Sequence, residues 1–175
     1  LVFSEIVMAQ ADTVALIFDE PYNIELPRNF RRSDMGLMRN HTVMPDTTGL
    51  SSLHISGSAE FNDLNLPAIL KDINYFPFID IDLRQETHGF VNGMSVSWYG
   101  KYDWADTALS REQVIALEKK KLDSLYKARI IEVTHVIQKN KADDTFEKIR
   151  DTSFTVISAM TEEELAKKNE INYFR

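Results

Sequence analysis

The chain has 175 residues, of which 43% are hydrophobic and 27% are charged, which is enough for one ordinary domain with a buried core. Its net charge of −7 argues against nucleic acid as a default partner, and an anionic ligand would need a locally basic pocket. The sequence contains no cysteine, which excludes disulfides and thiolate metal sites within it.

The first residues, LVFSEIVMAQADT, are apolar and include Ala9-Gln10-Ala11, a pattern similar to the cleavage site of a secretory signal. Glu5 interrupts this run and no basic segment precedes it, so a clipped first strand or helix is the alternative. We expect residues 1–12 to be a signal remnant or a disordered N-terminus. We expect a secreted or periplasmic protein, otherwise a cytoplasmic one, and no run is long enough to span a bilayer.

The run TVALIF at residues 13–18 predicts a strand, because it is rich in β-branched and aromatic residues and ends at Asp19-Glu20-Pro21. Residues 26–46 predict a loop that is the most basic stretch of the chain. Its arginines are Arg28, Arg31, Arg32 and Arg39. They form either a solvated or ion-paired face, or a site where one or two of them reach substrate phosphates.

A short strand is expected at residues 53–55, and Asn65 is expected to cap a helix over residues 66–73. The apolar run at residues 75–83, YFPFIDIDL, is followed by dense polar residues and glycines. This pattern is typical of a buried strand that delivers its C-terminal end to a functional site.

Carboxylates and a histidine gather after that run. Asp80 and Asp82 share one face of a strand by period-two alternation, and Arg84 follows on the same face. With Glu86 and His88 they have the residue types of an acid/base or metal site. We favour the alternative, a buried ion-pair network of Asp82, Arg84, Glu86 and His88, over a metal centre.

Gly89 and Gly93 bracket FVN and predict a hairpin or tight loop, after which residues 95–99 resume a strand. The aromatic residues Trp98, Tyr99 and Trp104 are expected to contribute packing.

Ser110 with Gln113 predicts a capping box for a helix over residues 110–127. The charged residues 118–121 are expected on its solvated face. Further strands are expected at residues 129–137 and 146–157.

Between these strands lies a polar loop with Lys139 and Lys141. Thr161 with Glu164 predicts the cap of a helix that runs through Asn169, and a strand is expected at residues 171–174.

Three blocks carry a resemblance to a known family. DLRQETHGFVNG at residues 82–93, followed by VSWYG and DWA, is very similar to a run in the cysteine phytases, the protein-tyrosine-phosphatase-like inositol polyphosphatases. LPRNFR at residues 26–31 and GLSSLHISGSAEF at residues 49–61 agree with the family in order and spacing. The resemblance therefore extends from about residue 26 to residue 175.

The resemblance implies an α/β fold, a partial protein-tyrosine-phosphatase-like core with a mainly parallel sheet and helices. Parallel strands are expected near residues 53, 79 and 172. Residues 13–93 and 159–175 would form this core, and residues 94–158 a small β-rich, barrel-like insertion with one helix. A parallel sheet without its central strands leaves apolar faces uncovered, so the isolated chain is expected to be poorly stable.

Members of this family attack phosphate with a cysteine thiolate in a loop of the form HCxxGxxRT, and an aspartic acid protonates the leaving group. Both follow, in the family, the segment that here is INYFR. The resemblance implies the N-terminal part of a phosphatase of myo-inositol hexakisphosphate, inactive by itself and in need of no metal or other cofactor. A phosphate-contacting basic residue of some members is replaced here near Ile17 and Phe18.

The resemblance also implies site residues. Asp103 in the DWA block corresponds to a residue that supports the phosphate loop. Lys141, with Lys139 as the near alternative, corresponds to a phosphate-contacting lysine. Among the arginines of the basic stretch, Arg31 lies inside the LPRNFR block and is the candidate substrate-binding arginine. The expected partner is an inositol phosphate, with a possible homodimer of the longer protein. The alternatives are a protein-tyrosine phosphatase and a non-catalytic inositol-phosphate-binding or scaffolding module.

Overall fold

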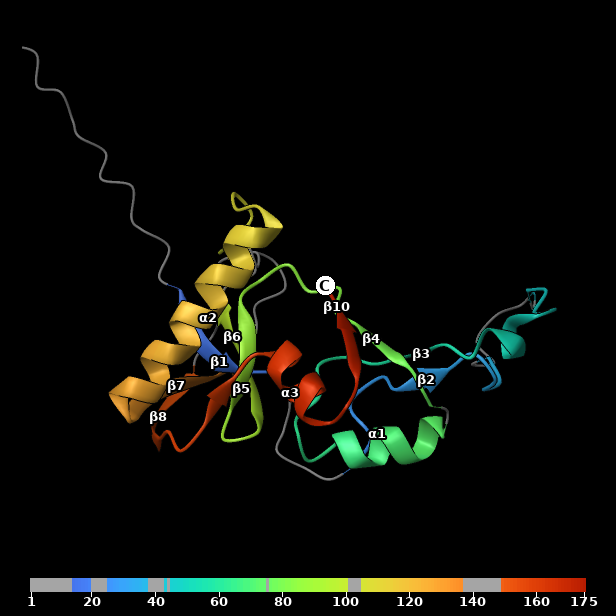
Figure 1. Cartoon of the computed structure of the whole chain (residues 1–175), viewed down its shortest axis with the longest axis horizontal. Coiled ribbons are helices and arrows are strands. Elements are labelled where there is room, and N and C mark those ends of the chain that lie inside the picture. The colour runs from blue at the N-terminus through green and yellow to red at the C-terminus, as the bar shows by residue number, and fades with distance from the viewer. Residues whose placement is uncertain are drawn as a thin grey trace, which may run out of the picture.

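The computed structural model describes residues 14–19, 25–37, 43, 45–74, 76–100, 105–136 and 149–175, and only the backbone of residues 135–136 and 149–151. Figure 1 shows a larger sheet covered by the long helix α2 (Arg111–Ala128) beside a smaller parallel strand pair. Among the described residues, no helix combines the length and apolar character that crossing a membrane needs.

The larger sheet has six strands in the order β8-β7-β1-β6-β5-β9. These are β1 (Ala15–Phe18), β5 (His88–Val91), β6 (Met94–Tyr99), β7 (Ile130–Val136), β8 (Ile149–Thr155) and β9 (Ala159–Met160). All neighbours are antiparallel except β1 and β7, which are parallel. The expected domain boundary at residue 93 falls in the turn between β5 and β6, and the division into domains stays a prediction.

Helix α2 begins with the expected capping box, in which Ser110 accepts from the Gln113 amide and Gln113 reaches back to the Ser110 amide. The helix packs its apolar stripe on the sheet, and Leu122 lies among the buried residues there. The other members of this core are Val91, Val96, Ile131, Val133 and Val156. Burial of these aliphatic side chains supplies the main stabilisation of this part of the molecule.

The turn between β5 and β6 is tighter than the sequence suggested. Strand β5 already includes Gly89, and only Asn92 and Gly93 form the turn, with φ of 50° and 83°. Two positive φ values are typical of the two-residue Asn-Gly hairpin. The Asn92 side chain donates to the Thr155 carbonyl at 2.7 Å and accepts from the Ile157 amide at 2.7 Å, so it also ties the hairpin to the end of β8.

Gly93→Ala is expected to lower the free energy of unfolding by about 1–3 kcal/mol, because an alanine there would keep the left-handed φ of 83° and its β-carbon would clash with the Asp63 side chain. Gly36→Ala is the matched control, since nothing lies within 4 Å of its added β-carbon. Urea denaturation of both variants measures the difference. Equal stabilities would contradict this role of Gly93.

The smaller part contains the parallel pair β4 (Ile79–Ile81) and β10 (Asn172–Phe174), with Tyr173 opposite Asp80. Helices α1 (Leu66–Ile73) and α3 (Glu162–Lys168) pack beside it. The shared core consists of Leu66, Phe90, Leu165, Ala166 and Ile171. Phe90 belongs to β5, so this core also joins the smaller part to the larger sheet.

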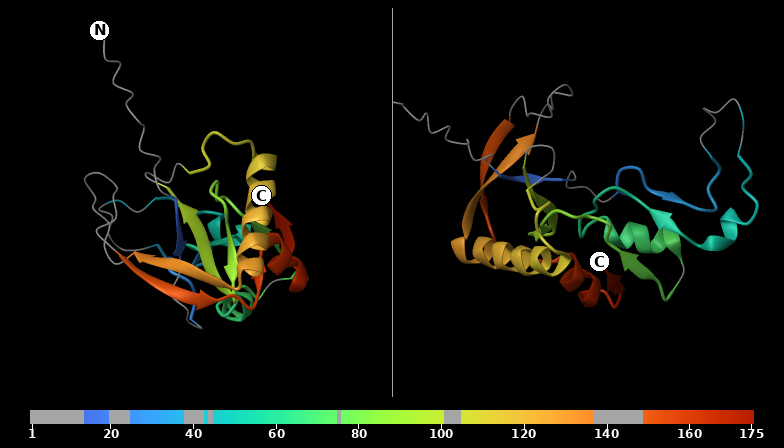
Figure 2. Two further views of the ribbon diagram at one scale, coloured as in Figure 1. Left: turned by 90° about the vertical axis from the view of Figure 1, so that its left-hand side faces the viewer. Right: turned by 90° about the horizontal axis from the view of Figure 1, so that it is seen from above.

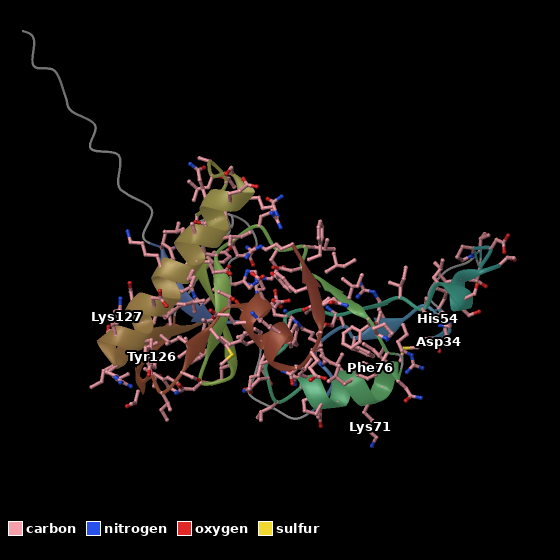
Figure 3. All side chains as sticks on the ribbon, viewed as in Figure 1. Asp34, His54, Lys71, Phe76, Tyr126 and Lys127 are labelled. Carbon is pink, nitrogen blue, oxygen red and sulfur yellow. The ribbon has the colours of Figure 1, made fainter. Side chains whose placement is uncertain are left out.

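Strands β2 (Arg31–Arg32) and β3 (Ser56–Gly57) form an antiparallel pair in an arm that ends in the 3-10 helix η1 (Leu50–Leu53). In the view from above in Figure 2, this arm projects away from the larger sheet. Figure 3 shows His54 and Asp34 on this arm, and Tyr126 and Lys127 near the opposite end of the molecule on α2.

Several local expectations need correction. Residues 53–55 do not form a strand. The 3-10 helix η1 ends at Leu53, and His54 has a left-handed φ of 52°, which lies outside the β region of the backbone. Asn65 occupies the N-cap position of α1, but its side chain donates to the Glu25 carbonyl and accepts from the Asn62 amide instead of capping. Within the run at residues 75–83, the described residues 76–83 contain a single strand, the three-residue β4, whose Ile79 and Ile81 are 60% and 59% exposed.

Other expectations hold. The parallel pairing of strands near residues 79 and 172 is confirmed by β4 and β10, and the Thr161–Glu164 capping box of α3 is present. The α/β class is confirmed, as a mixed arrangement of sheets and helices.

Candidate functional site

A hollow of about 960 Å³ lies along β4, between α1, α3 and the β2–β3 arm. Its apolar wall includes Phe76, Ile79, Ile81 and Leu83, and Phe76 is labelled beside α1 in Figure 3. Among the described residues β4 pairs with β10 alone, so no described strand occupies its other edge, which we call the open edge. The side chains that follow β4 form the polar end of the same hollow, and they include the sequence candidates Asp82, Arg84 and His88.

Arg84 is the shared cation of two carboxylates. Its Nη2 lies 3.0 Å from Asp19 Oδ2 and its Nε 2.5 Å from Glu86 Oε1. Burial raises the pKa of Asp19 despite this arginine, whereas for Glu86 the attraction of Arg84 outweighs burial and lowers the pKa. Asp19 also accepts from the Ser97 hydroxyl at 2.6 Å, so the ion pairs link the end of β1, β6 and the segment after β4.

His88 is 1% exposed and is surrounded by carboxylates. Its Nε2 lies 3.2 Å from both Asp82 Oδ2 and Glu162 Oε2, and its Nδ1 lies 2.9 Å from the Glu86 carbonyl. Burial lowers the pKa of His88, but the Asp82 and Glu162 carboxylates outweigh it and raise the pKa to about 9. The imidazole is therefore positively charged at neutral pH.

Asp80 and Asp82, two residues apart on β4 and just after it, differ in protonation. Burial and the neighbouring Glu162 raise the pKa of Asp80 to about 8. Burial alone would raise the pKa of Asp82 as well, but His88 and the Arg84 amide lower it to about 2. Asp82 is thus an anion at neutral pH, whereas Asp80 holds a proton beside Glu162.

Arg175 and Glu118 complete the cluster and were missed in the sequence. Arg175 Nη1 lies 2.7 Å from Glu118 Oε2, and its Nη2 donates to the Glu86 carbonyl at 2.8 Å. Glu118 is 3% exposed on α2 and also accepts from the His88 amide at 2.9 Å. A helical signal points to Glu118, because it lies four residues from Val114 and from Leu122, which are both buried.

Asp82, His88 and Glu162 are also the residue types of a metal site, with one ligand atom each within 4.8 Å of the others. Asp82 Oδ2, however, already accepts from the Tyr173 hydroxyl at 2.8 Å and lies 3.2 Å from Arg175 Nε. A metal ion bound there would be repelled by the guanidinium. The contacts therefore favour an ion-pair network.

A second polar cluster surrounds Thr87, the residue before His88. Asp106 Oδ2 accepts from the Thr87 amide at 2.6 Å, and Lys121 donates to the Thr87 hydroxyl at 2.7 Å. The Lys121 ammonium lies 5.0 Å from the centre of the Trp98 ring and 3.8 Å from Asp106 Oδ1. Lys121 was expected on a solvated face, but its side chain is 22% exposed, and burial lowers its pKa.

The structure brings the sequence candidates Asp82, Arg84, Glu86 and His88 together at the end of β4. Arg31 lies on β2, is exposed, donates to the Asn29 carbonyl at 3.0 Å and lines the same hollow. Asp103, Lys139 and Lys141 lie outside the described residues, so their roles stay predictions.

Comparisons with known proteins agree with the family resemblance found in the sequence. Residues 81–175 match the model of the PTP-like phytase family, whose description is "Inositol hexakisphosphate". The effector protein hopD2 of Pseudomonas syringae pv. tomato is 32% identical over 87 residues, which cover 46% of this chain and 19% of that protein.

Solved structures of PTP-like phosphatases are also similar to this chain. The PTP-like myo-inositol phosphatase from Mitsuokella multacida, in complex with myo-inositol-(1,3,4,5)-tetrakisphosphate, has a TM-score of 0.80 and 32% identity over 93% of this chain. The PTP-like phytase from Bdellovibrio bacteriovorus has a TM-score of 0.62 and 27% identity over 93% of this chain.

The chain spans 27% of the Mitsuokella chain and 49% of the Bdellovibrio chain. The family model covers more than half of the chain, and the resemblance seen in the sequence is confirmed. This protein belongs to the PTP-like phytase family.

Proposed function

We propose that this chain is the N-terminal part of a phosphatase that hydrolyses phosphomonoesters of myo-inositol hexakisphosphate by a cysteine-thiolate mechanism. The catalytic loop would lie beyond residue 175. The proposal rests on the family match, on the inositol phosphate bound by the Mitsuokella relative, and on the greater length of the solved relatives.

The single observation that carries the proposal is the open edge of β4 in the apolar hollow. Parallel sheets are covered on both faces and continue through further strands, yet Ile79, Ile81 and Phe174 are more than half exposed here. A further strand beside β4 would bury this edge. Its C-terminal end would then emerge beside Asp82 and Arg84, since neighbouring parallel strands end at the same edge of a sheet.

In this mechanism the thiolate attacks the phosphorus and displaces the inositol alkoxide, which the aspartic acid protonates. Water then hydrolyses the phosphocysteine, releasing inorganic phosphate and regenerating the thiol. Backbone amides and the loop arginine stabilise the charge on the transferring phosphoryl group. The chain described here would supply the wall of the pocket and the scaffold behind the loop.

The test is to read the coding DNA past codon 175, express the complete reading frame and measure phosphate release from inositol hexakisphosphate. We expect an HCxxGxxRT loop and activity in the complete protein, none in residues 1–175 alone, and none after Cys→Ser in that loop. A reading frame without the cysteine would favour the non-catalytic binding module. A complete protein that cleaves only phosphotyrosine would favour the tyrosine phosphatase.

Asp103→Ala is expected to reduce turnover of inositol hexakisphosphate by the complete protein by about 10²-fold, because a displaced phosphate loop loses its alignment. Asp123→Ala is the control, since Asp123 is exposed on α2. Steady-state kinetics and thermal unfolding of both variants separate lost turnover from lost folding. Unchanged turnover in Asp103→Ala would remove this residue from the site.

Phosphate contact by Lys141, with Lys139 as the alternative, belongs to the same proposal, as do export to the periplasm or medium and homodimerisation of the complete protein. Lys141→Ala would then raise KM, more strongly at low salt, where charges are least screened.

A further inference from the structure

Helix α2 directs two side chains of opposite charge, Glu118 and Lys121, toward the interior of the molecule. Glu118 and Lys121 are three residues apart, which places their side chains on neighbouring positions of one helix face. Their neighbours Lys119 and Lys120 are exposed, whereas Glu118 is 3% exposed and the Lys121 side chain 22%. Burying charged side chains costs free energy unless partners compensate it, so the partners indicate what these residues do.

Glu118 reaches the end of the parallel strand pair. It accepts from the His88 amide and binds Arg175, which directly follows β10. Arg175 in turn donates to the carbonyl of Glu86 at 2.8 Å and of Arg84 at 3.3 Å. A single carboxylate of α2 thus fixes the end of β10 against the segment that leaves β4.

Lys121 reaches the segment after β6, where its ammonium lies 3.8 Å from Asp106 Oδ1. It binds the hydroxyl of Thr87, and the amide of Thr87 donates to Asp106, which is 6% exposed. Asp106 directly follows the DWA block that contains Asp103. The contacts of Lys121 therefore fix one end of that block against the DLRQETHG segment.

We propose that Glu118 and Lys121 are positioning residues: acting through Arg175 and Asp106, they set the two chain segments that flank the proposed phosphate loop. This inference rests on the proposed function, in which the segment after Arg175 leads to the general acid and Asp103 supports the loop. Neither residue touches substrate. Both residues belong to helix α2, which covers the larger sheet, and each holds one of the two segments in place.

The first test uses the complete protein with inositol hexakisphosphate. Glu118→Gln and Lys121→Met are expected to lower kcat per folded molecule about 10- to 100-fold, with KM changed less than about threefold, because displacement of reacting groups by about 1 Å costs turnover on this scale. Asp123→Asn and Lys120→Met, exposed on the same helix, are the controls and should match wild type. A purely structural role would lower the melting temperature and leave kcat per folded molecule unchanged, which would overturn the proposal.

The second test needs no activity. Hydrogen exchange of the complete protein is expected to accelerate about 10-fold or more in the variants, at the His88 amide in Glu118→Gln and at the Thr87 amide in Lys121→Met, and in neither control. Unchanged exchange would overturn the proposal even if kcat falls. An inactive wild-type protein with faster exchange in the variants would refute the proposed function and the catalytic part of this inference, while the contacts themselves stand.

Discussion

Arg84→Met is expected to lower the free energy of unfolding by about 3–5 kcal/mol, the range for removing one partner of a buried ion pair. The substitution keeps most of the side-chain volume but leaves Asp19 and Glu86 without their shared cation. Their side chains are 7% and 14% exposed, so water cannot replace the guanidinium. Urea denaturation at pH 7 measures the loss.

Arg28→Met is the matched control, because Arg28 and its partner Glu60 have side chains that are 62% and 29% exposed. Exposed pairs contribute at most about 1 kcal/mol. The loss in Arg84→Met should shrink at acid pH, where protonation of Asp19 and Glu86 removes their charge. Equal losses in the two variants, or a loss in Arg84→Met that does not change with pH, would contradict the network.

Elements with local signals could be predicted from the sequence. The capping boxes at Ser110 and Thr161 are complete within four residues, and both helices begin where these patterns indicate. Proline at the start of α1 and the apolar spacing behind it are equally local. The sequence also indicates the hairpin after Gly89, although its turn is the shorter Asn92-Gly93 pair, whose left-handed φ values Asn and Gly tolerate best.

Elements whose conformation depends on distant residues could not be predicted in full. The run at residues 75–83 has the composition of a buried strand, but composition does not say what covers each face, and Ile79 and Ile81 face the hollow. The segment LSSLHI has strand-like residues, yet Gly49 and His54 take left-handed φ values that enclose a 3-10 turn.

The candidate site also contains some residues with partners near in the sequence and others with distant partners. Arg84 and Glu86 are two residues apart, so their pairing was visible in the sequence. Glu118, Glu162 and Arg175 come from elements 30 to 91 residues away from their partners and meet only in the folded chain. The charged run EKKK indicates a solvated face for Glu118, although the spacing of Glu118 from Val114 and Leu122 places it on the buried stripe.

The contribution of His88 to the free energy of unfolding is expected to fall by about 3 kcal/mol between pH 6.5 and pH 9, because the folded chain binds the His88 proton more tightly than the unfolded chain does. Its pKa rises from 6.5 to about 9 on folding, and each pKa unit corresponds to about 1.4 kcal/mol. This contribution is complete below pH 6.5 and is lost as the pH rises through 9. Asp80 acts in the same direction, since its pKa rises from 3.8 to about 8.

Chemical denaturation at several pH values from 6.5 to 9 measures this slope, and His88→Gln should flatten it while Asp80→Asn removes only the carboxyl part. If His88→Gln does not fold, NMR titration of the wild-type imidazole gives the same information, with an expected pKa well above 6.5. The contribution of Asp82 to stability has the opposite pH dependence. Its pKa falls from 3.8 to about 2 on folding, so this contribution is present above pH 3.8 and is lost only in acid. Stability that stays constant or rises between pH 6.5 and 9 would mean that His88 is neutral and that the carboxylates around it are compensated by Arg175 alone.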